Sequence, residues 1–171
     1  FNRQYGVDYF PLPEPQILGV ATRVMSLRDG SNKMSKSDSS DYSRLNLTDD
    51  VDVIALKIRK ARTDADPLPD TPSGLEGRAE AANLVGIYAA LSETDAKEVC
   101  HQFAGKMFSE FKNELCDLAV ARMGPIARKI VELTADTDHV DGILSCGAER
   151  ASAIAKQHLC EIQDIIGLLR P

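Results

Sequence analysis

Apolar residues recur at helical spacing through most of the chain after residue 47. The stretch TDDVDVIALKIRKART, residues 48–63, places Ile54, Ile58 and Ala61 on one face of a helix. Aspartates fill the first turn of this stretch, and lysines and arginines gather toward its end, as the helix dipole favours. Thr48 stands immediately before the pattern and is the expected N-cap. The sequence therefore predicts a helix that begins after Thr48.

The same periodicity predicts five further helices. They cover residues 78–91, 94–103, 109–133, 137–145 and 148–166. Gly124 and Pro125 should kink or split the third of these, and Gly147 should close the fourth. The last helix is expected to bury one face, formed by Ala151, Ala155, Leu159, Ile162 and Ile166.

The first forty residues follow a different pattern. Three prolines within residues 11–15 exclude the interior of a regular helix. The apolar run VATRVMSL then predicts a short strand near residues 22–27, which Asp29 and Gly30 end. The loop GSNKMSKSDSS, residues 30–40, follows this strand. The expected fold class is mainly α, with a strand-bearing N-terminal part followed by an antiparallel helical bundle.

Composition excludes several classes of protein. Hydrophobic residues make up 43% of the chain, which is ample for a core, whereas aromatic residues make up 5% and Trp is absent. This argues against aromatic platforms for single-stranded nucleic acid. No run of about 18 apolar residues occurs, so no membrane partner is expected. The cysteines contain no CxxC pair and the three histidines form no ligand pattern, so we expect reduced thiols and no metal ligands.

Charge is unevenly distributed along the chain. The net charge is -6, yet residues 1–38 hold five Lys and Arg against four Asp and Glu. An acidic body argues against non-specific binding of nucleic acid. On composition alone, Lys33 and Lys36 in a serine-rich segment predict a solvated surface loop.

The order of residues in this loop carries more information than its composition. KMSKS, residues 33–37, is a signature of class I aminoacyl-tRNA synthetases, and its chance occurrence in such a chain is about 10⁻⁴ from average residue usage. Eight stretches of the chain agree in order and spacing with one family of these enzymes. They are FNRQYG, PLPEPQI, RVMSLRDGSNKMSKSD, DDVDVIALKIRKARTD, NLVGIYAALS, FKNELCDLAV, GPIARKI and GAERASAIA. With them, essentially the whole chain resembles the C-terminal half of bacterial tryptophanyl-tRNA synthetases. Tyrosyl-tRNA synthetases share the loop but continue with a different helical region.

This resemblance implies ATP-dependent activation of tryptophan and transfer of the tryptophanyl group to tRNA(Trp). Lys33 and Lys36 are the implied catalytic residues, because positioned ammonium groups stabilise charge on the phosphoryl oxygens. The implied ATP site comprises Val24, Lys33, Met34, Ser35, Lys36 and Ser37. Val24 and Met34 would contribute through the backbone to the adenine site, although a purely structural role in a core strand remains open for Val24. Mg²⁺ would accompany ATP without a protein ligand identified in this chain.

The resemblance also implies a domain organisation. Residues 1–40 would be the C-terminal remnant of a Rossmann-like catalytic domain, and residues 41–171 a helical region that binds the tRNA anticodon. The basic residues available for tRNA contact there are Lys106, Lys112, Arg122, Arg128 and Lys129; for each of them an ordinary solvated charge remains the alternative. A homodimer and a cytoplasmic location are implied for the whole enzyme.

The chain departs from the family pattern in two respects. The HIGH-type ATP signature and most of the tryptophan pocket are absent, so this piece alone is expected to be inactive. DSS also stands after the motif where the family often has DPN, which removes a proline from the loop exit. Because Phe1 is not a natural start, we expect a longer source protein. The alternatives are a fragment of another class I synthetase, such as a tyrosyl enzyme, and a non-catalytic helical binding module with a degenerate synthetase tail.

Overall fold

A computed structural model describes residues 1–17 and 23–169. By its internal contacts the chain divides into two compact units. One comprises Phe1–Gln16 with Leu133–Pro171, and the other comprises Ile17–Glu132. Thr22, the first residue of the predicted strand, lies outside the described residues.

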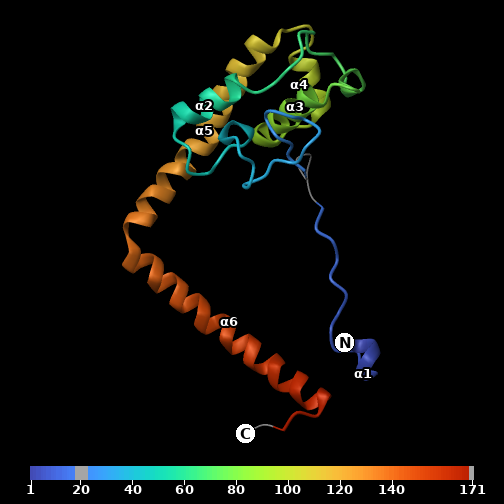
Figure 1. Ribbon diagram of the computed structural model, residues 1–171, viewed down its shortest axis with the longest axis vertical. Coiled ribbons are helices and arrows are strands. Elements are labelled where there is room, and N and C mark those ends of the chain that lie inside the picture. Colours follow the sequence, from blue (N-terminus) through green and yellow to red (C-terminus); the bar gives the residue numbers. More distant parts are fainter. Residues whose placement is uncertain (18–22, 170–171) are drawn as a thin grey trace. The chain divides into compact units, whose positions relative to one another are not determined.

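Helices make up the regular structure of the described residues (Figure 1). They are α1 (Asn2–Tyr5), η1 (Asp41–Ser43), α2 (Val51–Arg59), η2 (Pro72–Leu75), α3 (Ala79–Ser92), α4 (Ala96–Gln102), α5 (Phe108–Ala135) and α6 (Thr137–Ile166). The mainly α fold class is confirmed. The strand predicted near residues 22–27 is wrong over its described part, where a single antiparallel bridge joins Met25 to Lys33. One pair of short segments with no further strand beside it rarely forms a stable ladder.

The N-cap of helix α2 lies two residues later than predicted. Asp50, not Thr48, is the N-cap, and its side chain accepts a hydrogen bond of 2.8 Å from the backbone N–H of Val53. Ile54 and Ile58 are buried as predicted. The sequence misplaced the cap because several side chains in this stretch can act as caps, and only the turn geometry selects one.

A second unexpected feature of α2 is a buried lysine. The Lys57 ammonium lies 2.6 Å from an Asp49 oxygen and 2.7 Å from an Asp41 oxygen, and its side chain is 2% exposed. Burial acts to lower the pKa of Lys57, but the hydrogen bonds to Asp41 and Asp49 outweigh it, and the pKa is raised. The hydrogen bond from Lys57 in turn lowers the pKa of Asp41. The ion pair between Lys57 and Asp41 joins the second turn of α2 to η1, which follows the KMSKS segment.

The two long helices differ from the prediction. Helix α5 runs unbroken through Pro125, and α6 runs unbroken through Gly147. A proline inside a helix costs about 3 kcal/mol. Gly124 and Ala127 on either side are buried, and a Cβ at Gly124 would lie 3.1 Å from the Val51 side chain, so packing against α2 holds this turn in place. A mid-helix glycine costs only about 1 kcal/mol, too little to end a helix of 30 residues.

The predicted buried face of α6 is not buried in this chain. Among its described residues none falls in the buried class, and Leu159 is 53% exposed. Periodicity in a sequence identifies an apolar face but not the surface that covers it. The unit that contains α6 has a polar contact instead: the Tyr9 hydroxyl donates a hydrogen bond of 2.7 Å to Glu161.

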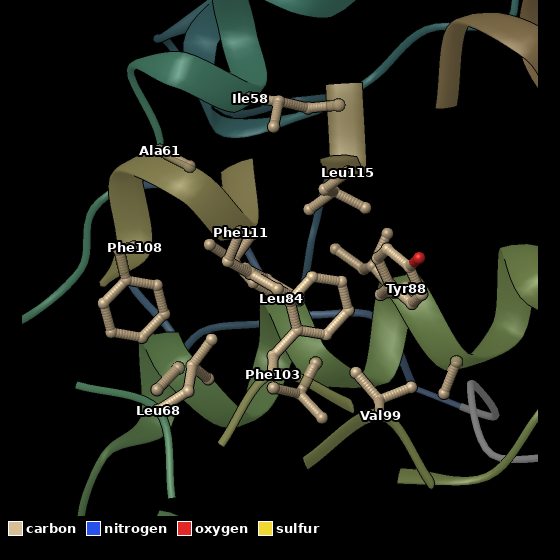
Figure 2. Packing of buried hydrophobic residues seen from close by; sticks show 14 of the residues in the cluster. Ile58, Ala61, Leu68, Leu84, Tyr88, Val99, Phe103, Phe108, Phe111 and Leu115 are labelled. Carbon is tan, nitrogen blue, oxygen red and sulfur yellow. The ribbon is translucent and has the colours of Figure 1, made fainter. Parts of the chain in front are cut away.

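The core of the second unit contains an aromatic cluster from α3, α5 and the residue that caps the end of α4. Figure 2 shows the side chains of Tyr88, Phe103 and Phe111 lying together. The Phe111 ring is fully buried, with its centroid 4.9 Å from that of Phe103 and 5.6 Å from that of Tyr88. The predictions of helices over 78–91 and 94–103 are confirmed to within two residues at each end. These helices hold the face on which the KMSKS segment is anchored.

Replacing Phe111 should remove the centre of this cluster. We expect Phe111→Ala to lower the free energy of unfolding by about 3–5 kcal/mol, because a large cavity would remain between α3 and α5. Leu56→Ala on the exposed side of α2, where the side chain is 39% exposed, is the matched control and should cost much less. Urea denaturation followed by circular dichroism measures both. Equal losses in the two variants would contradict the packing described here.

Lys57 allows a second stability test. Lys57→Met leaves Asp49 nearly buried without its cation, so we expect a loss of about 3 kcal/mol in the free energy of unfolding. The double variant Lys57→Met/Asp49→Asn removes the stranded charge and should regain part of that loss. If the double variant were as unstable as the sum of its single substitutions, the ion pair would not be the source of the effect.

Candidate active site

The KMSKS segment begins in a tight hairpin. The backbone N–H of Ser26 donates to Asn32 O at 2.8 Å, and that of Met34 donates to Val24 O at 3.0 Å. These two bonds flank the bridge between Met25 and Lys33. Lys33 therefore lies between the two hydrogen bonds of the hairpin, and the remainder of KMSKS after Met34 continues beyond them.

The turn of this hairpin is held by Asp29. Its carboxylate accepts hydrogen bonds from the backbone and hydroxyl of Ser31, at 3.0 and 2.5 Å, and from the Asn32 amide at 2.6 Å. These bonds from Ser31 and Asn32 lower the pKa of Asp29. The Asp-Gly break expected from the sequence is thus a closed turn with its own side-chain network.

Gly30 lies in this turn because there is no room for a side chain. It is buried, and a Cβ atom placed on it would lie 2.5 Å from the backbone of both Ala79 and Glu80. Such a separation is far inside van der Waals contact. The turn therefore packs closely against the first residues of α3, Ala79 and Glu80.

Asn83 fastens the other side of the hairpin to α3. Its Oδ1 accepts a hydrogen bond of 2.9 Å from the Met25 N–H, and its Nδ2 donates to Met25 O at 2.9 Å and to Ser26 O at 3.3 Å. The Asn83 side chain is buried. The sequence analysis missed this residue. The available signal was an amide within the apolar stretch AANLVGIY of a predicted helix, since a buried amide requires hydrogen-bond partners.

The structure brings together two of the residues expected at the ATP site. Val24 and Met34 are joined by their backbone hydrogen bond, and both side chains pack in part against the hydrophobic core. Ser35 and Ser37 lie together farther along, with their hydroxyl oxygens 3.0 Å apart. The arrangement presents backbone on one side and hydroxyl groups on the other.

The two lysines have a different environment. Lys33 and Lys36 are both exposed, and within the described part of the chain neither ammonium group has an ion-pair partner. The solvated loop expected from composition is therefore the state seen here. Two unpaired ammonium groups next to a fixed hairpin can bind an anionic ligand without first breaking a salt bridge.

A pocket of about 280 Å³ adjoins the hairpin. Val24, Met25 and Gly30 form one wall of it, and the facing residues of α3 form the other. The α3 residues are Ala79, Ala82, Asn83, Gly86 and Ile87. Small side chains and backbone dominate, and Arg23 at the edge supplies a cation. The volume is near the lower end for a site that binds a small molecule.

The loop exit is held without the proline of the family pattern. The Ser40 N–H, which follows the missing proline position, donates to Asp38 Oδ1 at 2.8 Å, and the Arg44 guanidinium donates to Asp38 O at 3.0 Å. The Leu27 N–H donates to Ser43 O at 2.9 Å, so the exit also returns to the hairpin. Hydrogen bonds replace the constraint that the proline would have provided.

The five basic residues suggested for tRNA contact fall into two groups. The Lys112 ammonium donates to Ala61 O at 2.6 Å, and burial lowers the pKa of Lys112. It satisfies the carbonyls that follow α2 and is not a free surface charge. The other four, Lys106, Arg122, Arg128 and Lys129, are exposed.

The described residues contain neither a candidate metal site nor a membrane-spanning helix. They contain no cluster of three or more His, Cys, Asp or Glu that could hold a metal ion. None of the helices described is long and apolar enough to cross a membrane.

Comparison with curated proteins gives close relatives over nearly the whole chain. A tryptophan–tRNA ligase of Brucella melitensis biotype 1 is 56% identical over 162 residues, which covers 95% of this chain and 46% of the relative. A tryptophan–tRNA ligase of Caulobacter vibrioides is 51% identical over 168 residues, covering 98% and 49% respectively. The chain thus spans about half the length of the curated relatives that it matches.

Solved structures agree with this comparison. The tryptophanyl-tRNA synthetase of Mycoplasma pneumoniae superposes with a TM-score of 0.74 at 26% identity, covering 88% of this chain and 47% of the other. That of Campylobacter jejuni gives a TM-score of 0.59 at 26% identity, covering 98% and 49%. The resemblance stated from the sequence motifs is confirmed.

The sequence-family comparison bears on the part of the chain that holds the hairpin, α2, α3 and α4. The model of the family described as tRNA synthetases class I (W and Y) matches residues 1–123, well over half of the chain. This chain therefore belongs to the class I tRNA synthetases of the tryptophan and tyrosine group.

Proposed function

We propose that the whole protein is a tryptophan–tRNA ligase, which activates tryptophan with ATP and transfers the tryptophanyl group to tRNA(Trp). The observation that carries this proposal is the 56% identity, over 95% of the chain, to proteins named for tryptophan and not for tyrosine. The anchored KMSKS hairpin supports it, because Lys33 and Lys36 are exposed and have no ion-pair partner among the described residues.

Lys33 and Lys36 are the catalytic residues in this proposal. The tryptophan carboxylate attacks the α-phosphorus of ATP and pyrophosphate leaves, so negative charge grows on the phosphoryl oxygens. Ammonium groups that approach those oxygens most closely in the transition state lower the barrier more than they tighten ATP binding. The exposure of both lysines and their lack of partners among the described residues fit that role. Ser35 and Ser37 supply further donors.

Val24 and Met34 complete the proposed ATP site through their backbone. Their position in the hairpin, partly packed on the core, fixes the peptide groups beside the pocket of about 280 Å³. Mg²⁺ bound with ATP would neutralise part of the triphosphate charge. The ion is proposed to enter with the nucleotide.

The remaining assignments are proposals of the same kind. Residues 1–40 belong to the catalytic domain and residues 41–171 to the region that binds the tRNA anticodon. Lys106, Arg122, Arg128 and Lys129 are the proposed surface from which tRNA contacts are drawn. Arg122 and Lys129 form exposed ion pairs with Glu93 and Glu132, and Lys112 donates to a backbone carbonyl of its own chain. The whole enzyme is proposed to act as a cytoplasmic homodimer.

The role of Lys36 can be tested by substitution in the whole protein. Lys36→Ala should lower the rate of tryptophan-dependent pyrophosphate exchange by about 10²–10³, the usual effect of removing one donor to a transition-state anion. The KM for tryptophan should change less than twofold. Lys97→Ala, an exposed lysine on α4, is the matched control and should leave the rate unchanged. A wild-type rate in Lys36→Ala would exclude Lys36 from the mechanism.

Substrate identity is tested separately with the unmodified whole protein. Pyrophosphate exchange should depend on added tryptophan and should not occur with tyrosine. Exchange with tyrosine alone would reassign the protein to the tyrosyl enzymes. Absence of exchange with every amino acid would favour a non-catalytic module.

A further inference from the structure

We infer that Asn83 is a positioning residue for the KMSKS segment, and that α3 thereby sets where Lys33 and Lys36 lie relative to bound ATP. The consequence for ATP rests on the proposed function, whereas the positioning itself rests on contacts within one compact unit. Asn83 would act through the backbone of Met25 and would not touch a substrate.

The direction of the peptide groups explains why an amide is needed. Met25 and Lys33 face each other between the two hairpin hydrogen bonds, as in the non-hydrogen-bonded pair of an antiparallel ladder. In such a pair the N–H and C=O of each residue point away from the partner strand. The outward groups of Met25 meet Asn83, which accepts from the N–H and donates to the C=O, both at 2.9 Å. The side chain of Asn83 therefore replaces a neighbouring strand at this one residue.

The hydrogen-bonding capacity of Asn83 matches the task. The carboxamide offers one acceptor oxygen and two N–H donors, and its bonds to Met25 and Ser26 use both kinds of group. The amide is also buried, so water cannot easily replace it. Loss of the side chain would leave the outward N–H and C=O of Met25 without their partners in this chain.

A second contact fixes the same hairpin to the same helix. Gly30 at the turn lies directly against the backbone of Ala79 and Glu80, one helical turn before Asn83. The hairpin is thus held by close packing at its turn and by hydrogen bonds at Met25. Lys33 is paired with Met25, so the first lysine of KMSKS is one bridge away from Asn83.

The anchoring helix and the anchored segment belong to different proposed regions of the protein. Asn83 lies within residues 41–171, the proposed tRNA-binding region, and the hairpin within residues 1–40. A displacement of α3 would therefore move the ATP-handling segment. The position of the helical region would thereby determine where Lys33 and Lys36 lie.

The test uses the whole protein carrying Asn83→Ala, with Asn83→Asp as a second variant that keeps the acceptor and loses both donors. Hydrogen exchange measured by mass spectrometry should show the amides of Met25 and Met34 exchanging at least tenfold faster in both variants. In pyrophosphate exchange, kcat/KM for ATP should fall at least tenfold while the KM for tryptophan changes less than twofold. Val99→Ala, a buried substitution on α4, should lower Tm without either effect.

The outcomes separate this inference from the proposed function. Unchanged amide exchange in the Asn83 variants would overturn the positioning role, whatever the activity. Faster amide exchange with unchanged ATP kinetics, or equal kinetic loss in Val99→Ala, would overturn control of the ATP segment. If the unmodified protein exchanges pyrophosphate with no amino acid, the proposed function fails, and the amide exchange alone decides the role of Asn83.

Discussion

The peptide groups of a lone hairpin must find hydrogen-bond partners on its outer edge, and that requirement governs the functional end of this chain. A buried N–H or C=O without a partner costs about 1–3 kcal/mol. Among the described residues no further strand pairs with the outer edge of Val24–Ser26, so the need is met by a side chain, that of Asn83. The position of the hairpin is consequently only as well defined as the position of α3.

Helix α3 is suited to this role because it is held from several directions. Buried apolar residues occupy most of its length, and Tyr88 joins the aromatic rings contributed by α4 and α5. Dense packing of this kind resists displacement, because side chains in a close-packed core have few alternative arrangements. The aromatic cluster therefore does more than stabilise the fold. It supplies the rigid base from which the amide of Asn83 projects.

The sequence predicted what depends on local patterns and missed what depends on partners. The periodicity of α3 and α4 and the face of α2 that holds Ile54 are local features, and they were predicted correctly. The KMSKS motif is also local, and the family that it indicated is confirmed. The burial of one face of α6 was wrong, because an apolar stripe does not specify the surface that covers it. Continuity through Pro125 depends on packing of Gly124 against Val51, 73 positions earlier in the chain. Asn83 was missed for the same reason, because its role depends on hydrogen bonds to the backbone of Met25, which is distant in the sequence.

The loop has anchored ends and two ammonium groups without ion-pair partners among the described residues, and this combination suits the proposed transition-state binding. Before the motif, Gly30 and Asn83 hold the hairpin to α3; after it, Arg44 and the buried Lys57 hold the exit to η1 and α2. The acidic residues nearest the exit are already engaged, Asp41 by Lys57 and Asp38 through its own turn. They are therefore less available to pair with Lys33 or Lys36. In a chain with a net charge of -6, the engagement of these nearby carboxylates leaves both ammonium groups available for the proposed binding of a triphosphate.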